Sequence, residues 1–264
     1  MGETSFRGPV TFPKEGVLDV AGNLPHPFSG LPISIVTQIG EDGLGGVQYY
    51  FNHFHQWEGP TAEGSAGGWT LSGVTGAGTV VLTNTRHGSI QLTADGTANA
   101  DPTLALGSAT LGADFLYTLG KRIWCFARLA VSDANLMEVF FGLGTPDTEP
   151  TVTNTFPSDG IFFEKASTAT DFDFHVRKDG ASTETVGATG LTLTDGGYAV
   201  IGFMVDVNGY IIPYANGTAR TAAVVAPTNA NVPDAAADVM QFMVGFRQAS
   251  KNIDLDWLLI AQEV

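Results

Sequence analysis

Apolar and polar residues alternate with a period of two in the second half of this chain. In the run 171–177, Phe172, Phe174 and Val176 occupy every second position, and polar residues fill the positions between them. Successive side chains of a β-strand point to opposite faces, so this pattern predicts a strand with one buried face. Three further runs that are rich in apolar residues also predict strands, at 198–206, 239–246 and 253–260.

The last of these runs contains four apolar residues that are spaced two apart. We expect their side chains on one face: Ile253, Leu255, Trp257 and Leu259. Asp254 and Asp256 lie between them and begin the opposite face. This run therefore predicts a strand that closes the core near the end of the chain.

Short turn sequences separate the predicted strands. Asp179-Gly180, Asn208-Gly209 and Asn216-Gly217 each lie between apolar runs. Asn-Gly is a strong hairpin signal, because a type I′ turn needs two residues with positive φ. We therefore expect antiparallel strands that are joined by tight turns.

The first half of the chain is less regular. Residues 1–45 contain five prolines with glycines between them, and a proline fixes φ and removes a backbone donor. We therefore expect an extended arm here, with neither a helix nor a central strand. The run 46–57 is rich in aromatic residues and predicts a strand, whereas residues 59–118 predict short strands between long loops.

No predicted element has the 3.6-residue apolar spacing of a helix, and no repeat of fixed period is present. Strands with one buried face must pack that face against a second sheet. We therefore predict an all-β fold, an antiparallel two-sheet jelly-roll sandwich over residues 46–264 that follows an extended arm over residues 1–45.

Charge and composition narrow the choice of partners. The 264 residues carry a net charge of −15, from 27 acidic and 12 basic residues. Such a surface repels phosphate backbones, so we expect no nucleic-acid partner. We also expect no membrane contact, since no apolar run is long enough for a span and the first residues lack a signal-peptide pattern. The protein is therefore expected to be made and kept in a cytoplasm, or released by lysis.

The chain from about residue 120 onward resembles the concanavalin-like (laminin-G-like) jelly-roll superfamily. The resemblance rests on the order of six segments: Asp159-Gly160-Ile161-Phe162-Phe163, Phe172-Asp173-Phe174-His175-Val176-Arg177, Ile201-Gly202-Phe203-Met204-Val205-Asp206 with Gly209, Tyr214-Ala215-Asn216-Gly217, the Val244-Gly245 strand and Leu255-Asp256-Trp257-Leu258-Leu259-Ile260-Ala261. These segments mark strands and turns of the fold. They do not identify a ligand.

The opening Phe6-Arg7-Gly8-Pro9-Val10 is similar to openings of tailed-bacteriophage head proteins, as is the pairing of a Gly/Pro-rich arm with a Gly/Thr/Ala-rich β domain. This resemblance implies a virion structural protein, first of all a decoration protein that stabilises the head from the outer capsid surface. It implies assembly in the host cytoplasm, the major capsid protein as partner, and a homo-oligomer that we take to be a trimer. A fibre or tail component is the alternative within this class.

The arm and the aromatic run supply candidate contact residues for such an interface: Phe6, Arg7, Pro9, Val10, Phe12, Tyr49, Tyr50 and Trp57. Both faces of the run 47–57 are aromatic, so one face is expected to meet the core and the other a second element or subunit. Together with Trp69 and Tyr210, the same strand residues are candidates for a sugar-stacking platform. A carbohydrate-binding module is therefore the alternative function.

A catalytic centre is not expected from the sequence. Jelly-roll glycoside hydrolases use two carboxylates on one strand face, and the look-alikes here are Asp171 with Asp173 and Asp254 with Asp256. Neither pair stands in the Glu-x-Asp-x-x-Glu pattern of those enzymes, and each lies beside turn-like polar sequence, which favours solvated strand edges. No nucleophile elbow, phosphate-binding loop or zinc-protease motif is present. We therefore predict that the chain is not an enzyme.

No cofactor is expected either. His53 and His55 would point the same way on a strand, with Glu58 behind them, but a third ligand is not assigned. Cys125 is the single cysteine and lies in an apolar run that predicts a buried side chain. Structural calcium stays open without a defined ligand set, and its candidates are loop carboxylates: Asp95, Asp101, Asp133, Asp147 and Asp159.

Overall fold

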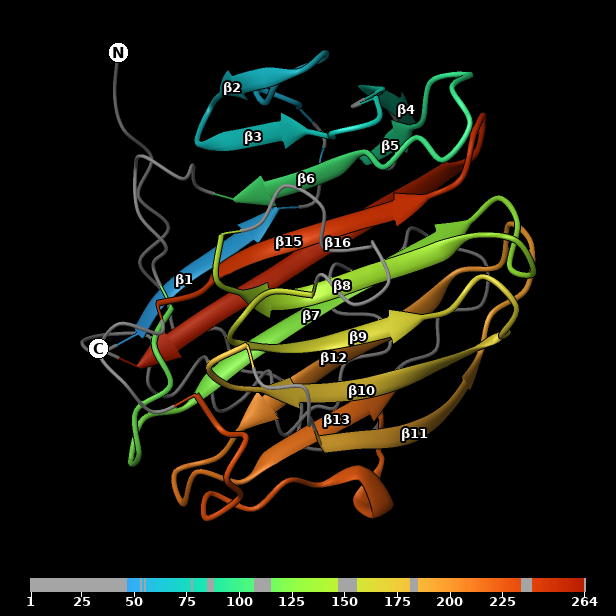
Figure 1. The fold of residues 1–264 in the computed structure, drawn as a ribbon. Helices are drawn as coiled ribbons and strands as arrows, with labels where there is room; N and C mark the ends of the chain where they lie inside the picture. The colour runs from blue at the N-terminus through green and yellow to red at the C-terminus, as the bar shows by residue number, and fades with distance from the viewer. Residues whose placement is uncertain are drawn as a thin grey trace, which may run out of the picture.

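The computed structural model describes residues 47–52, 54, 56–76, 78–84, 88–106, 115–146, 156–180, 185–233 and 239–263. Within these ranges sixteen strands form two antiparallel sheets that pack face to face (Figure 1), which confirms the predicted two-sheet sandwich. The predicted arm lies outside the described residues, and with it Phe6, Arg7, Pro9, Val10 and Phe12. The division into arm and domain therefore stays a prediction.

The first sheet, sheet A, contains the N-terminal and C-terminal strands of the described chain. Its strands are, in spatial order, β14 (Thr218–Ala219), β13 (Ile211–Ala215), β12 (Ala199–Val205), β7 (Ile123–Val131), β16 (Asn252–Glu263), β5 (Ser89–Thr93) and β4 (Thr79–Asn84). β1 (Val47–Asn52) pairs with the second half of β16, beside the segment that β5 leaves free.

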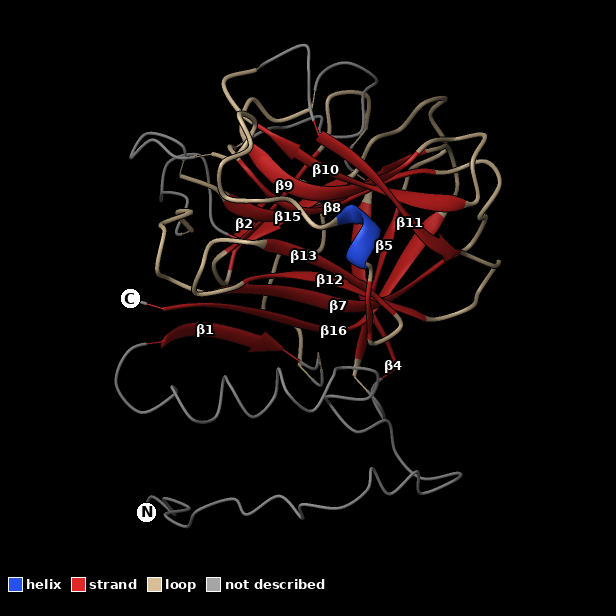
Figure 2. Ribbon diagram, turned by 90° about the horizontal axis from the view of Figure 1, so that it is seen from below, coloured by secondary structure: helices blue, strands red, loops and turns tan. Residues whose placement is uncertain are grey.

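The second sheet, sheet B, lies over the first, and Figure 2 shows the two as separate layers. Its order is β11 (Thr185–Thr192), β10 (Asp171–Arg177), β9 (Gly160–Lys165), β8 (Glu138–Gly144), β15 (Gln241–Arg247), β6 (Thr103–Leu106), β3 (Trp69–Ser72) and β2 (Gly64–Ala66). Among the described residues the one helix is a short 3-10 turn, η1 (Thr221–Ala223), beside β11 and β13.

The core between the sheets is strongly aromatic. Phe163 and Phe174 of sheet B lie 4.8 Å apart between ring centres, and Phe174 lies 6.0 Å from Phe203 of sheet A. All three side chains are fully buried, as are Phe172 and Val176, which were predicted to face inward. The alternation in this part of the sequence therefore identified the buried face correctly, and the polar positions between must face outward.

The closing strand β16 differs from its prediction. Ile253 and Leu255 face the core between the sheets, but Trp257 and Leu259 belong to a separate apolar cluster on the outer face of sheet A. The cause is a β-bulge between Leu255 and Trp257, which shifts the register of β16 against β7. An extra residue in one strand reverses the side-chain alternation beyond it, so the expectation that all four share one face is wrong.

The turns largely follow the sequence. Asn216-Gly217 has φ of 47° and 76°, and Asp179-Gly180 has φ of 57° and 61°, so both have the two positive φ values of a type I′ turn. At Asn208-Gly209 only the glycine has a positive φ, because Asp206 shapes this turn differently. The Asp206 carboxylate accepts hydrogen bonds from the backbone N–H groups of Asn208 and Tyr210, each at 2.9 Å.

Candidate functional site

Three carboxylates lie close together on the outer face of sheet B. Glu164 of β9 and Asp173 of β10 are direct partners across the two strands, and their neighbours Phe163 and Phe174 point into the core. Glu138 lies on the adjoining strand β8, where Phe140 is the direct partner of Glu164. We call Glu138, Glu164 and Asp173 the carboxylate cluster. It lies at one end of the sheet, and Asp173 is exposed while Glu138 and Glu164 are partly buried.

The cluster is electrostatically unfavourable for the fold. Like charges directly opposite each other on two strands are destabilising. Partial loss of hydration raises the pKa of Asp173, and the nearby Glu164 carboxylate raises it further, against an opposing effect of His175. Burial likewise raises the pKa of Glu138, with Arg247 acting against this effect. Carboxyl groups with raised pKa values hold a proton at mildly acidic pH and can donate it.

An aromatic stack supports the cluster from one side. The rings of Phe140 and Phe162 lie 4.8 Å apart, and the ring of His175 lies parallel to Phe162 at 5.1 Å. His175 is almost fully buried, and its Nε2 lies 3.3 Å from an Oε atom of Glu164. The stack therefore holds the imidazole in place, and the imidazole orients the Glu164 carboxylate.

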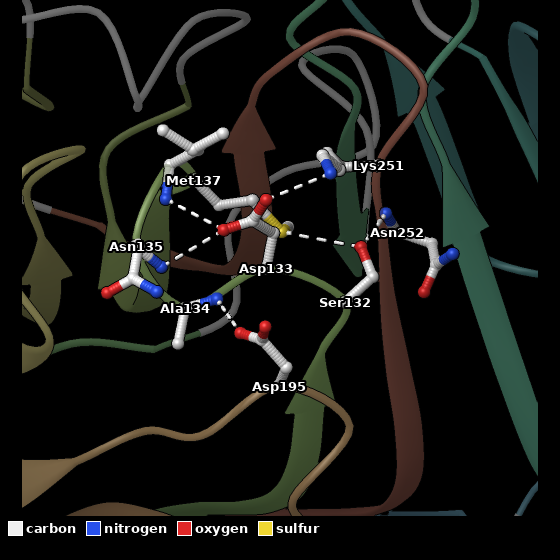
Figure 3. A network of polar contacts seen from close by, with 9 residues as sticks. Ser132, Asp133, Ala134, Asn135, Met137, Asp195, Lys251 and Asn252 are labelled. Atoms are coloured by element: carbon white, nitrogen blue, oxygen red, sulfur yellow. Dashed lines mark hydrogen bonds and ion pairs between the residues drawn. The ribbon is translucent and has the colours of Figure 1, made fainter.

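The loop that leads into Glu138 is fixed by a polar network (Figure 3). Asp133 accepts hydrogen bonds from the backbone N–H groups of Asn135 and Leu136 at 3.1 and 3.0 Å, and it pairs with Lys251 at 2.9 Å. The hydrogen bond from Lys251 is the main reason that the pKa of Asp133 is lowered. Asp195 accepts the backbone N–H of Ala134 at 2.7 Å, which ties this loop to the connection between β11 and β12.

Lys165 holds the same loop from the core side. Its side chain is fully buried, and its Nζ donates to the carbonyl groups of Met137, Ala166 and Ala169 at 2.5, 2.9 and 2.8 Å. Burial lowers the pKa of Lys165. Met137 directly precedes Glu138, so the buried ammonium fixes the point at which the chain enters β8.

The carboxylate pairs that the sequence offered have different surroundings. Asp171 and Asp173 are both exposed, but β10 is not an edge strand, because β11 pairs with it. Asp171 accepts a hydrogen bond from the Thr192 hydroxyl. Of the two, Asp173 has another carboxylate, Glu164, directly opposite, whereas Asp171 does not and contributes its charge to the raised pKa of Asp173.

The other pair lies on the central strand β16, so the expectation of a solvated edge is wrong for it. Asp254 accepts a hydrogen bond from the Gln91 amide at 2.9 Å, and burial raises the pKa of Asp254. Asp256 is almost fully buried in an ion pair with Arg128, whose guanidinium lies 4.3 Å from the ring centre of Tyr198. Both carboxylates thus have structural partners.

The predicted aromatic contact residues are only partly described. For Tyr49 and Tyr50 the structure describes the backbone, as members of β1. Trp57 is half-buried and packs against Phe54 and Trp69, with ring centres at 6.0 and 5.5 Å. Its role in an interface stays a prediction.

Other expected features are decided by burial. Trp69 is buried in the core and Tyr210 is exposed. Cys125 is buried as expected, and burial raises the pKa of its thiol. His53 and His55 lie outside the described residues, and Glu58 is exposed.

In the described part of the chain no three His, Cys, Asp or Glu residues are grouped so that they could hold a metal ion. No helix there has the length and apolar character of a membrane span.

Comparison with known proteins gives a fold but no family. No protein-family model and no curated protein matches the chain. An endo-1,3-β-glucanase from Streptomyces sioyaensis is similar in structure, with a TM-score of 0.54 and 10% identity over 83% of this chain and 97% of the glucanase. A Bacillus licheniformis β-glucanase has a TM-score of 0.50 and 14% identity over 82% and 98%. A GH16 protein from Bacteroides ovatus, in complex with a product, has a TM-score of 0.50 and 10% identity over 80% and 99%.

These structures confirm the concanavalin-like jelly-roll fold, and they overturn the prediction that the chain is not an enzyme. For that prediction we looked for two catalytic carboxylates within one strand, because the sequence shows which residues share a strand but not which strands are neighbours. The sheet instead brings Glu164 and Asp173 together from two strands. Glu138 and Glu164 were missed. The signal that could have found Glu164 is its outward position directly after three apolar residues, Ile161, Phe162 and Phe163, in the strand Gly160–Lys165.

Proposed function

We propose that this chain is a glycan-binding jelly-roll domain that hydrolyses its glycan at the carboxylate cluster. The observation that carries the proposal is the direct pairing of Glu164 with Asp173, together with the raised pKa of Asp173. An unfavourable pair of like charges in an otherwise consistent sheet is typical of a functional site. The fold, which glucanases share, supports the same class of substrate.

The two carboxyls have different roles in this mechanism. Asp173 keeps its proton and donates it to the glycosidic oxygen as the bond to the anomeric carbon breaks. Glu164, oriented by His175, attacks that carbon and forms a glycosyl ester. Water then releases the sugar, and the Asp173 carboxylate takes a proton from it. Side chains directly opposite on two strands have Cβ atoms roughly 5 Å apart, near the roughly 5 Å carboxyl spacing of retaining enzymes, so we expect retention of configuration.

The test is the release of reducing ends from soluble β-1,3-glucan and mixed-linkage β-glucan. We expect Glu164→Gln and Asp173→Asn each to lower the rate by about 100-fold or more, because each removes one half of the acid–nucleophile pair. The rate should fall as the pH rises through the raised pKa of Asp173, since the proton donor is then lost. Binding to the same glucans should persist in both variants.

Asp171→Asn is the matched control, because Asp171 is an exposed carboxylate on the same face of β10 without a carboxylate opposite. Its rate should stay within about twofold of the unchanged protein. Equal rates for Asp171→Asn and Asp173→Asn, or no cleavage and no glycan binding by the unchanged protein, would rule the proposal out.

A second proposal is a decoration protein on the outer surface of a phage head, bound to the major capsid protein as a homo-oligomer. It is supported by the opening Phe6-Arg7-Gly8-Pro9-Val10, with its similarity to phage head proteins. Deletion of residues 2–30 is expected to abolish binding to empty capsid shells while the far-ultraviolet circular dichroism of the sandwich is unchanged. Full occupancy of the shells by the shortened chain would contradict this proposal.

A further inference from the structure

Aromatic and aliphatic side chains occupy part of the outer face of sheet A. They belong to three neighbouring strands, and all of them are buried: Trp124 and Phe126 of β7, Val200 and Met204 of β12, and Trp257 and Leu259 of β16. We call these six residues the outer cluster. Figure 2 shows the strands that carry it as one layer. The carboxylate cluster lies on the other sheet, so the outer cluster takes no part in the proposed hydrolysis.

The outer cluster is buried more completely than a sheet alone can achieve. Trp124, Phe126 and Trp257 are each 0% exposed. Side chains on one face of a sheet stand side by side, so they cover each other's flanks and leave the tops open. The described apolar residues that pack against the cluster, Ile212 and Tyr214, belong to β13 of the same sheet. Full burial therefore requires a further layer above the cluster.

This layer also has to accept hydrogen bonds. Nε1 of Trp124 and Nε1 of Trp257 are buried, and neither has a hydrogen-bond partner among the described residues. An indole N–H is a donor only, and a buried donor without an acceptor is unfavourable. The covering layer is therefore expected to offer oxygen atoms as well as apolar surface.

Charged residues mark both ends of the cluster along β7. Arg122 pairs with Glu263 at 2.7 Å, and Arg128 pairs with Asp256. These charges are already compensated, and the centre between them is apolar. An apolar centre with a polar rim is typical of an interface. Its partner should be uncharged and apolar.

The chain has few segments that could supply this layer. Residues 85–87 connect β4 with β5, and β5 pairs with β16 only over Asn252–Leu255, before the cluster begins. Residues 1–46 join sheet A directly at β1. The other long undescribed segments each lead into or out of a strand of sheet B: 107–114, 147–155, 181–184 and 234–238.

We infer that residues 31–39 of the same chain lie across the outer cluster and cover it. This segment has no charged residue, and its β-branched side chains favour an extended backbone. In an extended segment Leu31, Ile33 and Ile35 share one face, which supplies the apolar surface. The carbonyl groups of an extended segment have no partner within it, so they accept hydrogen bonds from the two indoles.

The length and the entry point of this segment match the cluster. β1 begins at Val47, the register partner of Glu263, two residues beyond Ala261 of β16. Residues 40–46 contain four glycines, which allow the backbone to reverse its direction. Nine extended residues span about 28 Å, whereas a patch that is three strands wide and five residues long has a diagonal of roughly 17 Å. So short a tether gives a high effective concentration, which favours the same chain over a second copy.

The test is quenching of tryptophan fluorescence by acrylamide. Deletion of residues 2–39 should raise the quenching constant at least about twofold, because two of the four tryptophans lose their cover. Deletion of residues 2–30 is the matched control, since it keeps the segment and should leave the constant unchanged. A synthetic peptide of residues 29–41, added to the chain without residues 2–39, should restore the low constant. This rescue separates loss of the cover from unfolding.

A double substitution tests the same contact in the full chain. Ile33→Asp with Ile35→Asp should raise the quenching constant by a similar factor, because two charges replace apolar contacts. Ser34→Asp is the control, since it adds a charge to the opposite face of the segment and should change the constant by less than about 20%.

Three results would overturn the inference. The first is an unchanged constant after deletion of residues 2–39, and the second is an equal effect of Ser34→Asp and of the double substitution. The third is a constant that rises when the full chain is diluted and a dimer dissociates, since the cover would then come from a second copy.

Discussion

Replacement of Lys165 by methionine is expected to lower the free energy of unfolding by about 3 kcal/mol or more. Methionine keeps the length of the side chain but leaves the carbonyl groups of Met137, Ala166 and Ala169 without the Nζ donor that now joins them. Each buried acceptor without a partner costs about 1–3 kcal/mol, and solvent at the loop surface offsets part of the sum. Urea unfolding followed by tryptophan fluorescence measures the change.

Lys251→Met is the matched control for this prediction. The Nζ of Lys251 pairs with Asp133 at 2.9 Å, but its side chain is 31% exposed. Exposed ion pairs contribute about 1 kcal/mol or less, so this variant should unfold close to the unchanged protein. If both variants unfolded at the same urea concentration, the three carbonyl contacts of Lys165 would stabilise the fold no more than the exposed ion pair of Lys251 does.

Gly142→Ala should have an effect of similar size or larger. Gly142 lies in β8 with φ of 154°, where a Cβ would lie 2.5 Å from Phe162 Cα and 2.6 Å from the Ile161 carbonyl oxygen. These are backbone atoms of the neighbouring strand, which cannot move without opening the hydrogen bonds between β8 and β9. The clash and the unfavourable φ together are expected to lower the free energy of unfolding by about 3–5 kcal/mol.

Gly96→Ala provides the comparison, because the nearest atom to a Cβ there is the Ser250 hydroxyl at 4.0 Å. Its free energy of unfolding, measured by urea denaturation, should change by no more than about 0.5 kcal/mol. If Gly142→Ala were as stable as Gly96→Ala, the prediction would be wrong, because the backbones of β8 and β9 would then move apart at little cost in free energy.

The fold could be predicted from the sequence because its signals are local. The inward positions of Phe172, Phe174 and Val176 follow from alternation alone, and Asn216-Gly217 specifies its turn by the conformation that glycine allows. Such signals depend on neighbours within a few residues, which the sequence shows directly.

The candidate site could not be predicted in the same way, because it depends on register between strands. Nothing in the sequence states that Glu164 faces Asp173, since the pairing of β9 with β10 fixes this contact over nine residues of chain. Asp95 and Asp101 were recognised as loop carboxylates, but only the fold shows that Asp101 has an oxygen without a partner. Chemistry that arises between elements needs the arrangement of those elements.

The side chains of β16 alternate between the two faces of sheet A in one sense before the bulge and in the opposite sense beyond it. Before it, odd-numbered residues such as Ile253 face the interior, and beyond it even-numbered residues such as Leu258 do. Loss of the single residue Asp256 would remove the bulge and leave one regular alternation, with Trp257 still on the outer face and Leu258 still on the inner face. The bulge that takes up this extra residue, and not the hydrophobicity of Trp257, therefore places its indole on the outside of sheet A.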